Sequence, residues 1–598
     1  MKYMAIDFET VYTEDVSVRI MPTVNYCLHP VAVPYLVAVY NEEFQYTGEP
    51  EKFNWDVLKD HTLIMHNAHF DGVVLKRLHR EGKIPAWVLD LPIVDTADMS
   101  SYLRHPRALG DLVSVLFPDV KLEKSIRTKA KGKTARDVQG EGWWQDMVKY
   151  GGEDAEYTYK VWQQLSDRWP LHERKLSKMN RDSCWKGIHI DINLAHQYLE
   201  QLNSELSKLE RSIPWDWSDH KTPASPKMIR QQCREDGIEC PASFAEKSPE
   251  CAMWEEKHAE KYPWVRCLRD WKKRNFLRSR IKQLVDGVDE NNIYHYDLKY
   301  CGADSGRYSA GFGDGGSNRF SVHNMPRIPS FGIDIRKLLI AREGHSLMIW
   351  DLAQIEPRLV HWLTGNTELL TRIRETGVSV YQAEAETCYN KTWKNLKKED
   401  PELYSFIKAQ YLGCQYQCSG GKFQLLAKTM AGMDLTEIQA NKIVEDFRNN
   451  NPKVPRLWYK LQDQVKIAAS KNENLTIVLP SDRSLVYFNV RKGPFGFEAQ
   501  FTRGSKLYYK IYGGHLTNNL IQGAGRDVFC ENMLRLSDTE FGTPLWHAHD
   551  EGINEVPDEI ANDPKKQKEL ERLVTTSPAW GEDLPLGTEI VVSKHYLK

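Results

Sequence analysis

Two adjacent carboxylates near the C-terminal end restrict the fold of this chain more than any other short segment does. Asp550 and Glu551 stand side by side in "LWHAHDEGINEV" (545–556), between two apolar stretches. Two anions about 4 Å apart repel each other by roughly 4 kcal/mol at an effective dielectric constant of about 20. The flanking stretches predict the two strands of a hairpin with the acids at or near its bend, where both side chains can reach one site. Either solvent or a bound cation must offset their repulsion.

A third acid, Asp351, ends the apolar segment "LMIW" (347–350). Burial of a carboxylate is costly unless a cation accompanies it. Aspartates brought together from separate strands form the all-oxygen site that Mg²⁺ prefers. Two such ions can hold a triphosphate, activate a 3′-hydroxyl and neutralise the charge that develops in phosphoryl transfer. We therefore expect Asp351 and Asp550 to share bound cations.

A helical pattern lies between these acids in "YSFIKAQYLGCQYQ" (404–417). Lys408, Leu412 and Tyr416 are spaced four residues apart, which predicts one shared helical face. A cation, an apolar side chain and an aromatic ring in line could meet a phosphate, a sugar and a base. An ordinary amphipathic helix is the alternative.

The bulk composition predicts several folded domains. At 598 residues the chain is too long for one core, and 41% hydrophobic with 27% charged residues is typical of globular proteins. No run of 18 apolar residues occurs, and the N-terminus lacks the apolar core of a signal peptide. The eleven irregularly spaced cysteines are expected to be free thiols in a reducing compartment. We therefore expect a cytoplasmic protein without membrane association.

Local charge is more informative than the net charge of −2, because two basic runs occupy residues 121–136 and 266–284. The second run mixes Trp271, Phe276 and Ile281 with lysines and arginines. This pattern predicts a helix with one apolar and one phosphate-seeking face, although a solvated surface helix is an equal alternative. A Gly- and Ser-rich segment follows at 302–318, and we expect it to lie outside the core.

Acids also occur in the first 170 residues, where short apolar runs and helical patterns alternate as in an α/β domain. Asp7 and Glu9 are two residues apart, so a strand would direct both to one side. Tyr150 and Asp154 are four apart and would share a helical face. Asp71 follows another apolar run. Each acid taken singly is typical of a solvated surface.

Five segments together resemble family A DNA polymerases, the bacterial polymerase I type, in variants most like those of bacteriophage enzymes. Motifs A, B and C correspond to "DLAQIEPR", "KAQYLGCQY" and "HDE", which occur in the family's order and spacing. "DSGRYS" and "NNLIQGAGRD" resemble two further conserved segments. The resemblance covers roughly residues 180 to 598.

The resemblance implies a metal-dependent catalytic centre. Asp351 and Asp550 would bind two Mg²⁺ ions, for which Mn²⁺ could substitute, with the carbonyl of Leu352 helping and Glu551 in a lesser role. Lys408 would hold the triphosphate and act as general acid to pyrophosphate. Incoming dNTPs and primer–template DNA would be the partners of a monomeric enzyme, with any replisome or processivity factor unassigned.

The resemblance also implies nucleotide and DNA contacts. Glu356 would exclude a 2′-hydroxyl as a steric gate backed by Tyr416, with Gln354, Leu412 and Lys408 also touching the nucleotide. The residues expected to contact primer–template DNA are Arg307, Asn518, Gln522 and His549 near the primer terminus, and Lys272, Lys273 and Arg274 on duplex phosphates.

Four positions depart from the family pattern. Tyr404 stands where an arginine is usual, one turn before Lys408, and Leu412 replaces the usual Phe or Tyr. Gln417 replaces a glycine after the motif B tyrosine, and Pro357 replaces a leucine. Nucleotide affinity and sugar or base selectivity are therefore the properties least transferable from the family.

The N-terminal acids resemble the DEDDy class of 3′–5′ exonucleases, which has DxE, NxxFD and YxxxD segments. The resemblance implies that Asp7, Glu9, Asp71 and Asp154 bind two divalent metals and that Tyr150 orients the attacking water. The set of acids is complete, which predicts active proofreading.

The expected architecture is an α/β, ribonuclease H-like exonuclease domain followed by an α+β right-hand polymerase fold. The expected bounds are exonuclease 1–172, thumb 173–300, palm 301–375 and 476–598, and fingers 376–475. The expected function is DNA-dependent DNA polymerisation with proofreading, replicating phage DNA in the host cytoplasm. One alternative is a dedicated 3′–5′ exonuclease whose C-terminal region only grips DNA, and another is a non-catalytic DNA-binding factor.

Overall fold

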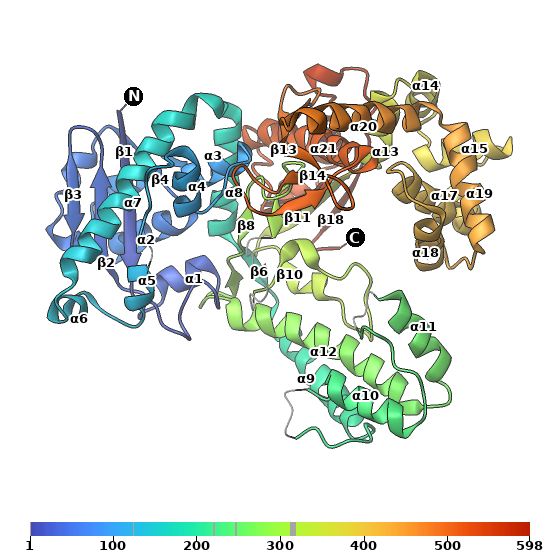
Figure 1. Cartoon of the computed structure of the whole chain (residues 1–598), viewed down its shortest axis with the longest axis horizontal. Coiled ribbons are helices and arrows are strands. Elements are labelled where there is room, and N and C mark those ends of the chain that lie inside the picture. The colour runs from blue at the N-terminus through green and yellow to red at the C-terminus, as the bar shows by residue number, and fades with distance from the viewer. Residues whose placement is uncertain (1, 124, 219–221, 245–247, 311–318, 598) are drawn as a thin grey trace.

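The computed structural model describes residues 2–123, 125–218, 222–244, 248–310 and 319–597. Figure 1 shows an N-terminal α/β unit, a central unit around strands β11 and β18, and two helical projections. The helical arm contains α9 to α12, and the distal helical unit contains α14 to α19. Within the described ranges, no helix is long and apolar enough to cross a membrane.

The N-terminal unit is a five-stranded mixed sheet with flanking helices. Its strands lie in the order β3-β2-β1-β4-β5, with β1 parallel to β4 and antiparallel to β2. Alternation along β1 sends Met4, Ile6 and Phe8 into a core shared with α2, so Asp7 and Glu9 lie on the other face. The principal elements are β1 Lys2–Thr10, β2 Pro34–Tyr40, β3 Gln45–Gly48, β4 His61–Met65, β5 Ile93–Asp95, α2 Ala68–Arg80 and α7 Trp144–Leu165.

Shorter helices complete this unit, and small strands link it to the rest. The helices are α1 Thr23–Leu28, α3 Thr96–Tyr102, α4 Leu109–Leu116, α5 Ser125–Lys129, α6 Ala135–Gly140 and the connecting α8 Leu171–Lys186. The strands are β6 Ile188–Ile190, β7 Ile293–Tyr294, β8 Leu298–Lys299, β9 Ser309–Ala310 and β10 Leu339–Ile340.

The helical arm is built from two long packed helices, α9 and α12, with α10 and α11 toward its far end (Figure 1). As its sequence predicted, α12 buries Trp271, Leu277 and Ile281, but Phe276 is 42% exposed. Neighbouring helical residues point about 100° apart, and Phe276 lies on the solvent side of the apolar stripe while Leu277 lies inside it. The apolar face is therefore narrower than expected. The bounds are α9 Ile192–Glu210, α10 Pro226–Glu235, α11 Pro249–His258 and α12 Pro263–Gly287.

The central unit contains an antiparallel sheet in the order β16-β17-β11-β18, covered by the long helix α21. Trp350 of β11 stacks on Phe529 of α21 at a ring distance of 5.1 Å. The neighbouring position must be a glycine, because a Cβ on Gly552 would lie 2.3 Å from the Trp350 ring. The bounds are β11 His345–Leu352, β16 Trp546–Ala548, β17 Glu551–Pro557, β18 Thr588–Ser593, α13 Ile355–Leu363, α21 Gly513–Ser537, α22 Asp558–Ala561 and α23 Pro564–Val574.

The distal helical unit has its own apolar core, formed by residues between Leu369 and Phe447. Helix α20 and a four-stranded sheet, β12-β13-β14-β15, form another cluster beside α21. The bounds are α14 Thr367–Thr376, α15 Val380–Tyr389, α16 Leu396–Glu399, α17 Pro401–Cys414, α18 Gly420–Ala431, α19 Glu437–Asn450, α20 Lys453–Lys471, β12 Leu475–Val478, β13 Ser484–Gly493, β14 Gly496–Gln500 and β15 Tyr508–Lys510.

The Gly- and Ser-rich segment is less superficial than expected. Residues 311–318 lie outside the described residues, but within the described part Ser305 is 1% exposed and Tyr308 is 5% exposed. The ring of Tyr308 packs edge-on against His547 at 4.5 Å. The composition predicted an exposed segment because large side chains are few in it. Tyr308, one of these few, is nevertheless buried in the core.

A buried ion-pair network joins α8 to α21. Arg526 donates two hydrogen bonds to the two carboxylate oxygens of Glu173, at 2.6 and 2.7 Å, and Tyr300 donates a third. Asp527 accepts from Arg483 at 2.8 Å. Burial alone would raise the pKa of Glu173, but the charge of Arg526 and these hydrogen bonds lower it to about 2. The network therefore favours an ionised carboxylate deep in the protein.

Replacement of Glu173 by Gln should lower the free energy of unfolding by about 3 kcal/mol at neutral pH, since each pKa unit corresponds to about 1.4 kcal/mol. Because folding lowers this pKa, its stabilisation is present above about pH 4.5 and is lost as the pH falls toward 2. Urea unfolding of both proteins at a series of pH values measures the difference. A difference that does not shrink between pH 5 and 2 would contradict this assignment.

Candidate active sites

The hairpin near the C-terminal end has the geometry that its sequence predicted. Strands β16 and β17 pair Ala548 with Glu551, so His549 and Asp550 form a two-residue turn in which His549 has φ 62°. In the register of β11 with β17, Asp351 lies opposite Glu551. The N–H of Leu352 also donates to the carbonyl of Asp550 at 3.0 Å. Asp351 and Asp550 are therefore neighbours at the ends of adjacent strands.

The two adjacent acids occupy different environments. Glu551 is 1% exposed and accepts a hydrogen bond from the hydroxyl of Tyr596, whereas Asp550 in the turn is partly exposed. Burial and the neighbouring charge of Glu551 raise the pKa of Tyr596. The chain therefore accommodates the Asp–Glu pair by holding the second carboxylate against a tyrosine hydroxyl, away from the partly exposed turn.

Glu356 is held by a cation and a hydroxyl from distant segments. Arg307 pairs with its Oε1 at 2.9 Å, and the Tyr416 hydroxyl donates to its Oε2 at 2.7 Å. Glu356 lies in the first turn of α13. Pro357 follows it without disruption, since first-turn N–H groups have no intrahelical partner. The structure thus brings together Glu356 and Tyr416, which the resemblance had grouped, with Arg307, which the resemblance had assigned to primer–template DNA.

The prediction that Lys408, Leu412 and Tyr416 share one helical face is wrong, because Tyr416 lies beyond the end of the helix. Lys408 is exposed and Leu412 is half-buried on α17, but that helix ends at Cys414 and Tyr416 lies in the following turn. The turn forms because Gln417 adopts φ 63°, which a regular helix cannot contain. Tyr416 is thereby directed to Glu356.

Gln417 occupies a backbone conformation that favours glycine, the residue usual in the family at this position. Its side chain accepts a hydrogen bond from the N–H of Gly514, at the start of α21, at 2.9 Å. A Cβ on Gly514 would lie 2.5 Å from the carbonyl oxygen of Tyr416. The hydrogen bond offsets part of the cost of the left-handed backbone and ties α21 to the turn that carries Tyr416.

An aromatic pair stands where the family usually has an arginine. Tyr404 packs edge-on against Tyr381 at 5.5 Å, and Gln354 lies beside both elements, accepting from the N–H of Val380 at 2.7 Å. Burial and the charges of Tyr404, Glu356 and Asp550 raise the pKa of Tyr381. Sequence reasoning did not single out Tyr381, because no local pattern indicates its proximity to Asp550.

Two residues of α21 remain accessible in an otherwise buried stretch. Between residues 516 and 530, only Asn518 and Gln522 are not buried, and their spacing places them on one helical face. His549 is exposed in the hairpin turn, and the ring of His323 lies 5.4 Å from it. His323 was not predicted, since it belongs to no motif of the sequence analysis.

The basic residues of α12 differ in availability. Lys273 is exposed, but Lys272 donates to the carbonyl of Phe244 at 3.3 Å. Arg274 pairs with Glu205 of α9 at 2.6 Å and stacks on Phe331 at 3.7 Å. Part of this basic run therefore stabilises the arm itself.

Three N-terminal acids converge on the face of the sheet that α7 covers. Asp7 and Glu9 of β1 and Asp154 of α7 each offer a carboxylate oxygen, and these oxygens lie within 4.8 Å of one another. Tyr150, one turn before Asp154, is 5% exposed, and burial and the charges of Glu9 and Asp154 raise its pKa. Helix α7 approaches closely because of Gly151, where a Cβ would lie 2.5 Å from Leu36.

Asp71 lies beside this group of three rather than within it. It is 2% exposed, and burial together with the charges of Asp95 and Glu9 raises its pKa well above the usual range. Asp95 has a structural role, since it accepts from the N–H groups of Asn67, Ala68, Ala97 and Asp98. An added cation would relieve the repulsion among these acids, which fits the oxygen-rich donor set of a Mg²⁺ site.

The basic run at 121–136 reaches this acid group. Burial alone would lower the pKa of Arg127 in α5, but the charges of Glu9, Tyr150 and Asp7 raise it. The Tyr12 hydroxyl donates to the Arg127 carbonyl at 2.6 Å and anchors the segment. Lys124 of the same run lies outside the described residues.

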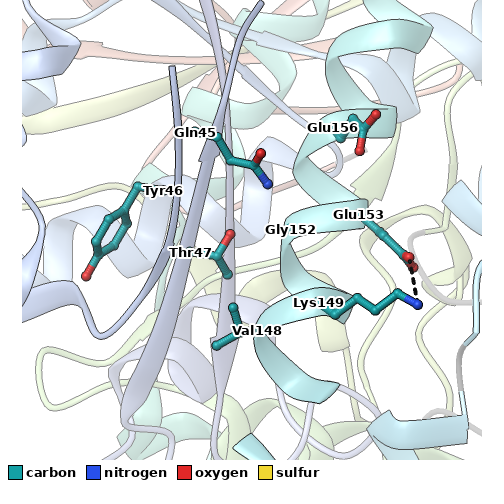
Figure 2. Close-up of a pocket in the computed structure, with 8 residues that line it drawn as sticks. All are labelled: Gln45, Tyr46, Thr47, Val148, Lys149, Gly152, Glu153 and Glu156. Atoms are coloured by element: carbon teal, nitrogen blue, oxygen red, sulfur yellow. Dashed lines mark ion pairs between the residues drawn. The ribbon is translucent and has the colours of Figure 1, made fainter. Parts of the chain in front are cut away.

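A groove of about 410 Å³ also opens between β3 and α7, lined by Gln45, Thr47, Lys149, Glu153 and neighbouring residues (Figure 2). The helical positions that line it lie roughly opposite Tyr150 and Asp154 on α7. This groove is therefore separate from the acid group.

Comparisons with known proteins assign the family. Residues 193–598 match the model of DNA polymerase family A. The chain is 22% identical over 532 residues to a DNA polymerase of Bacillus phage SP02, covering 79% of this chain and 78% of that protein. It is also 22% identical over 425 residues to DNA polymerase I of Aquifex aeolicus, covering 66% and 67% of the two chains.

A solved structure shares the fold. The polymerase domain of Pol1 from M. smegmatis, in complex with a DNA primer-template and dNTP, aligns with a TM-score of 0.65 at 17% identity. The alignment covers 94% of this chain and 93% of that one. The family model covers more than half of the chain, so the protein belongs to DNA polymerase family A and is a DNA-directed DNA polymerase.

Replacement of Gly514 by Ala should displace the Tyr416–Gln417 turn, because the new Cβ would lie 2.5 Å from a backbone oxygen. We expect a loss of about 1–3 kcal/mol in unfolding free energy and a raised KM for dNTPs. Gly525→Ala on the same helix is the matched control, since its Cβ would meet its nearest atom at 3.5 Å. Thermal unfolding and steady-state kinetics measure both effects. Equal behaviour of the two variants would contradict the proposed contact.

Proposed function

We propose that this polymerase adds dNTPs to a primer 3′ end at Asp351 and Asp550 and removes mispaired ends at a second, N-terminal site. The observation that carries the first part is the register of β11 with β17, which makes the two aspartates neighbours. The primer-template and dNTP named for the M. smegmatis structure support the same partners for this chain.

Divalent cations fit the donor sets of both sites. At the polymerase site, Asp351, Asp550 and the Leu352 carbonyl would hold two Mg²⁺ ions, for which Mn²⁺ could substitute. Bound there, such ions would supply Lewis acidity to the 3′-hydroxyl and the triphosphate. Glu551 would act only indirectly, since its carboxylate is buried against Tyr596.

The surrounding side chains would bind and orient the substrates. Lys408, exposed on α17, would hold the triphosphate and protonate the departing pyrophosphate. Glu356 would meet the C2′ position of the sugar, with Tyr416 behind it and Gln354 and Leu412 nearby. Because Tyr404 brings no positive charge, Lys408 would supply a larger share of phosphate binding than the family pattern implies.

The DNA would lie along the accessible residues of the central unit and the arm. Asn518 and Gln522 form an accessible polar face on α21, and we propose that Arg307 and His549 join them at the primer terminus. On the arm, Lys273 would contact duplex phosphates directly. Lys272 and Arg274 would attract the DNA mainly through the positive electrostatic potential of the arm, because their side chains already have protein partners.

The N-terminal unit would be a DEDDy-type 3′–5′ exonuclease of ribonuclease H-like fold. Asp7, Glu9, Asp71 and Asp154 would hold two divalent ions, and Tyr150 would orient the attacking water. The convergence of three of these acids within 4.8 Å supports the proposal. The expected domain bounds (exonuclease 1–172, thumb 173–300, palm 301–375 and 476–598, fingers 376–475) remain part of it.

The similarity to a Bacillus phage DNA polymerase supports a role in phage DNA replication, carried out by a monomer in the host cytoplasm. The alternative of a dedicated 3′–5′ exonuclease would need a C-terminal region without catalytic acids. Asp351 and Asp550 are present and adjacent, which disfavours it.

The two activities should be separable by mutation. Asp351→Asn or Asp550→Asn should lower primer extension by about 10³-fold, as expected when several kcal/mol of charge stabilisation are lost, and should leave trimming of a mismatched 3′ end intact. Asp7→Ala should abolish trimming and leave extension intact. Gel assays on matched and mismatched primers measure both.

Asp463→Asn is the matched control, because this acid is exposed on α20 and pairs with Lys466 of the same helix. Wild-type extension by both Asp351→Asn and Asp550→Asn would refute the polymerase site. Persistent trimming by purified Asp7→Ala protein would refute the exonuclease site.

A further inference from the structure

Arg104 of the N-terminal unit reaches into the central unit. It lies between α3 and α4, and its side chain is 12% exposed. Its guanidinium pairs with Asp304 at 2.7 Å and donates to the carbonyl of Phe501 at 3.0 Å. In return, its own carbonyl accepts from the N–H of Arg503 at 3.2 Å. One arginine is therefore bound to two separate segments of the polymerase portion.

This contact is closely packed. The loop between β14 and β15 lies against α4, and a Cβ on Gly504 would lie 2.6 Å from Val115 (Figure 1). The N-terminal unit and this loop therefore form a tight surface from which Arg104 extends toward Asp304.

Asp304 belongs to a compact turn that also carries Arg307. The N–H of Ala303 donates to the carbonyl of Arg307 at 3.1 Å, closing the turn around Asp304. Arg483 donates to the carbonyl of Ser305 at 2.9 Å from the other side. Because this hydrogen bond closes the turn between Ala303 and Arg307, the position of Asp304 is coupled to that of Arg307.

Arg307 in turn restrains Glu356. It holds Oε1 of this carboxylate, and Tyr416 holds Oε2. With both oxygens engaged, the side chain has one orientation. If Arg307 moves, Glu356 loses one of its two donors and regains rotamer freedom.

We propose that Arg104 is a positioning residue of the polymerase site: by holding the 303–307 turn it sets Arg307, and through Arg307 the orientation of Glu356. The inference rests on the proposed role of Glu356 in excluding a 2′-hydroxyl. It makes the N-terminal unit a structural part of sugar discrimination, independent of its exonuclease chemistry. A residue that only joined the two units would affect stability and leave selectivity unchanged.

The test measures the ratio of kcat/KM for dNTP to that for the matching rNTP, together with separate kcat and KM values. Arg104→Ala and the near-isosteric Asp304→Asn should each lower this ratio by between about two-fold and thirty-fold, the usual range for residues that act through others. Trimming of single-stranded DNA should stay at the wild-type rate. Arg104→Lys, which can still pair with Asp304, should restore most of the ratio.

Two control variants distinguish a failure of this inference from a failure of the proposed role of Glu356. Lys175→Ala removes another ion pair between segments, with Asp538 at 2.9 Å, which does not touch the turn, and its ratio should equal the wild-type value. Glu356→Ala should itself lower the ratio. The Arg104→Ala/Asp304→Asn double variant should lose no more than Arg104→Ala alone, because the pair with Asp304 is already broken when Arg104 is removed.

The outcomes are distinct. If Glu356→Ala keeps the wild-type ratio, the proposed steric gate is wrong and the inference falls with it. If Glu356→Ala lowers the ratio while Arg104→Ala and Asp304→Asn do not, the inference alone is overturned. A loss of thermal stability in Arg104→Ala at an unchanged ratio would likewise reduce Arg104 to a structural contact.

Discussion

The pairing register of β11 with β17 is the constraint on which the proposed polymerase site depends. A slip of one residue would turn Asp351 to the opposite face of the sheet. Two contacts fix the register: Gly552 leaves room for the Trp350 ring, and the Trp350 indole donates to Asn554 at 2.8 Å. Trp350 also stacks on α21, so the strand that carries Asp351 and the helix that carries the accessible polar face are positioned together.

Charged pairs between distant segments do the remaining positioning. Glu356 is oriented by Arg307 and Tyr416, which stand 49 and 60 residues away in the chain. The pair of Glu173 with Arg526 connects α8 to α21 in the same way. Breaking a buried pair leaves an unpaired charge that costs about 3–5 kcal/mol, so each pair specifies one arrangement of its two elements. The geometry of the proposed site is thus a property of the assembled units.

Local sequence patterns predicted the strands and the turn that depend mainly on interactions between residues close in the chain. The hairpin around Asp550 and the strand through residues 347–350 follow from apolar stretches and were found, with β11 continuing through Asp351 to Leu352. The position of Tyr416 beyond the end of α17 was not predictable, because it depends on the contact of Gln417 with Gly514. The ion pair of Arg274 with Glu205 inside the arm was likewise not predictable, because the two residues are far apart in the sequence. Sequence periodicity carries no information on such pairings.

Folding gathers distant carboxylates into two separate groups, and we propose that divalent cations complete each of them. Crystals grown with Mn²⁺, primer–template DNA and a non-hydrolysable dNTP analogue, measured for anomalous scattering, test it most directly. We expect manganese peaks within bonding distance of Asp351 and Asp550, and further peaks among Asp7, Glu9 and Asp154 when a 3′ end occupies the N-terminal unit. Well-ordered DNA and nucleotide with no manganese between Asp351 and Asp550 would contradict it.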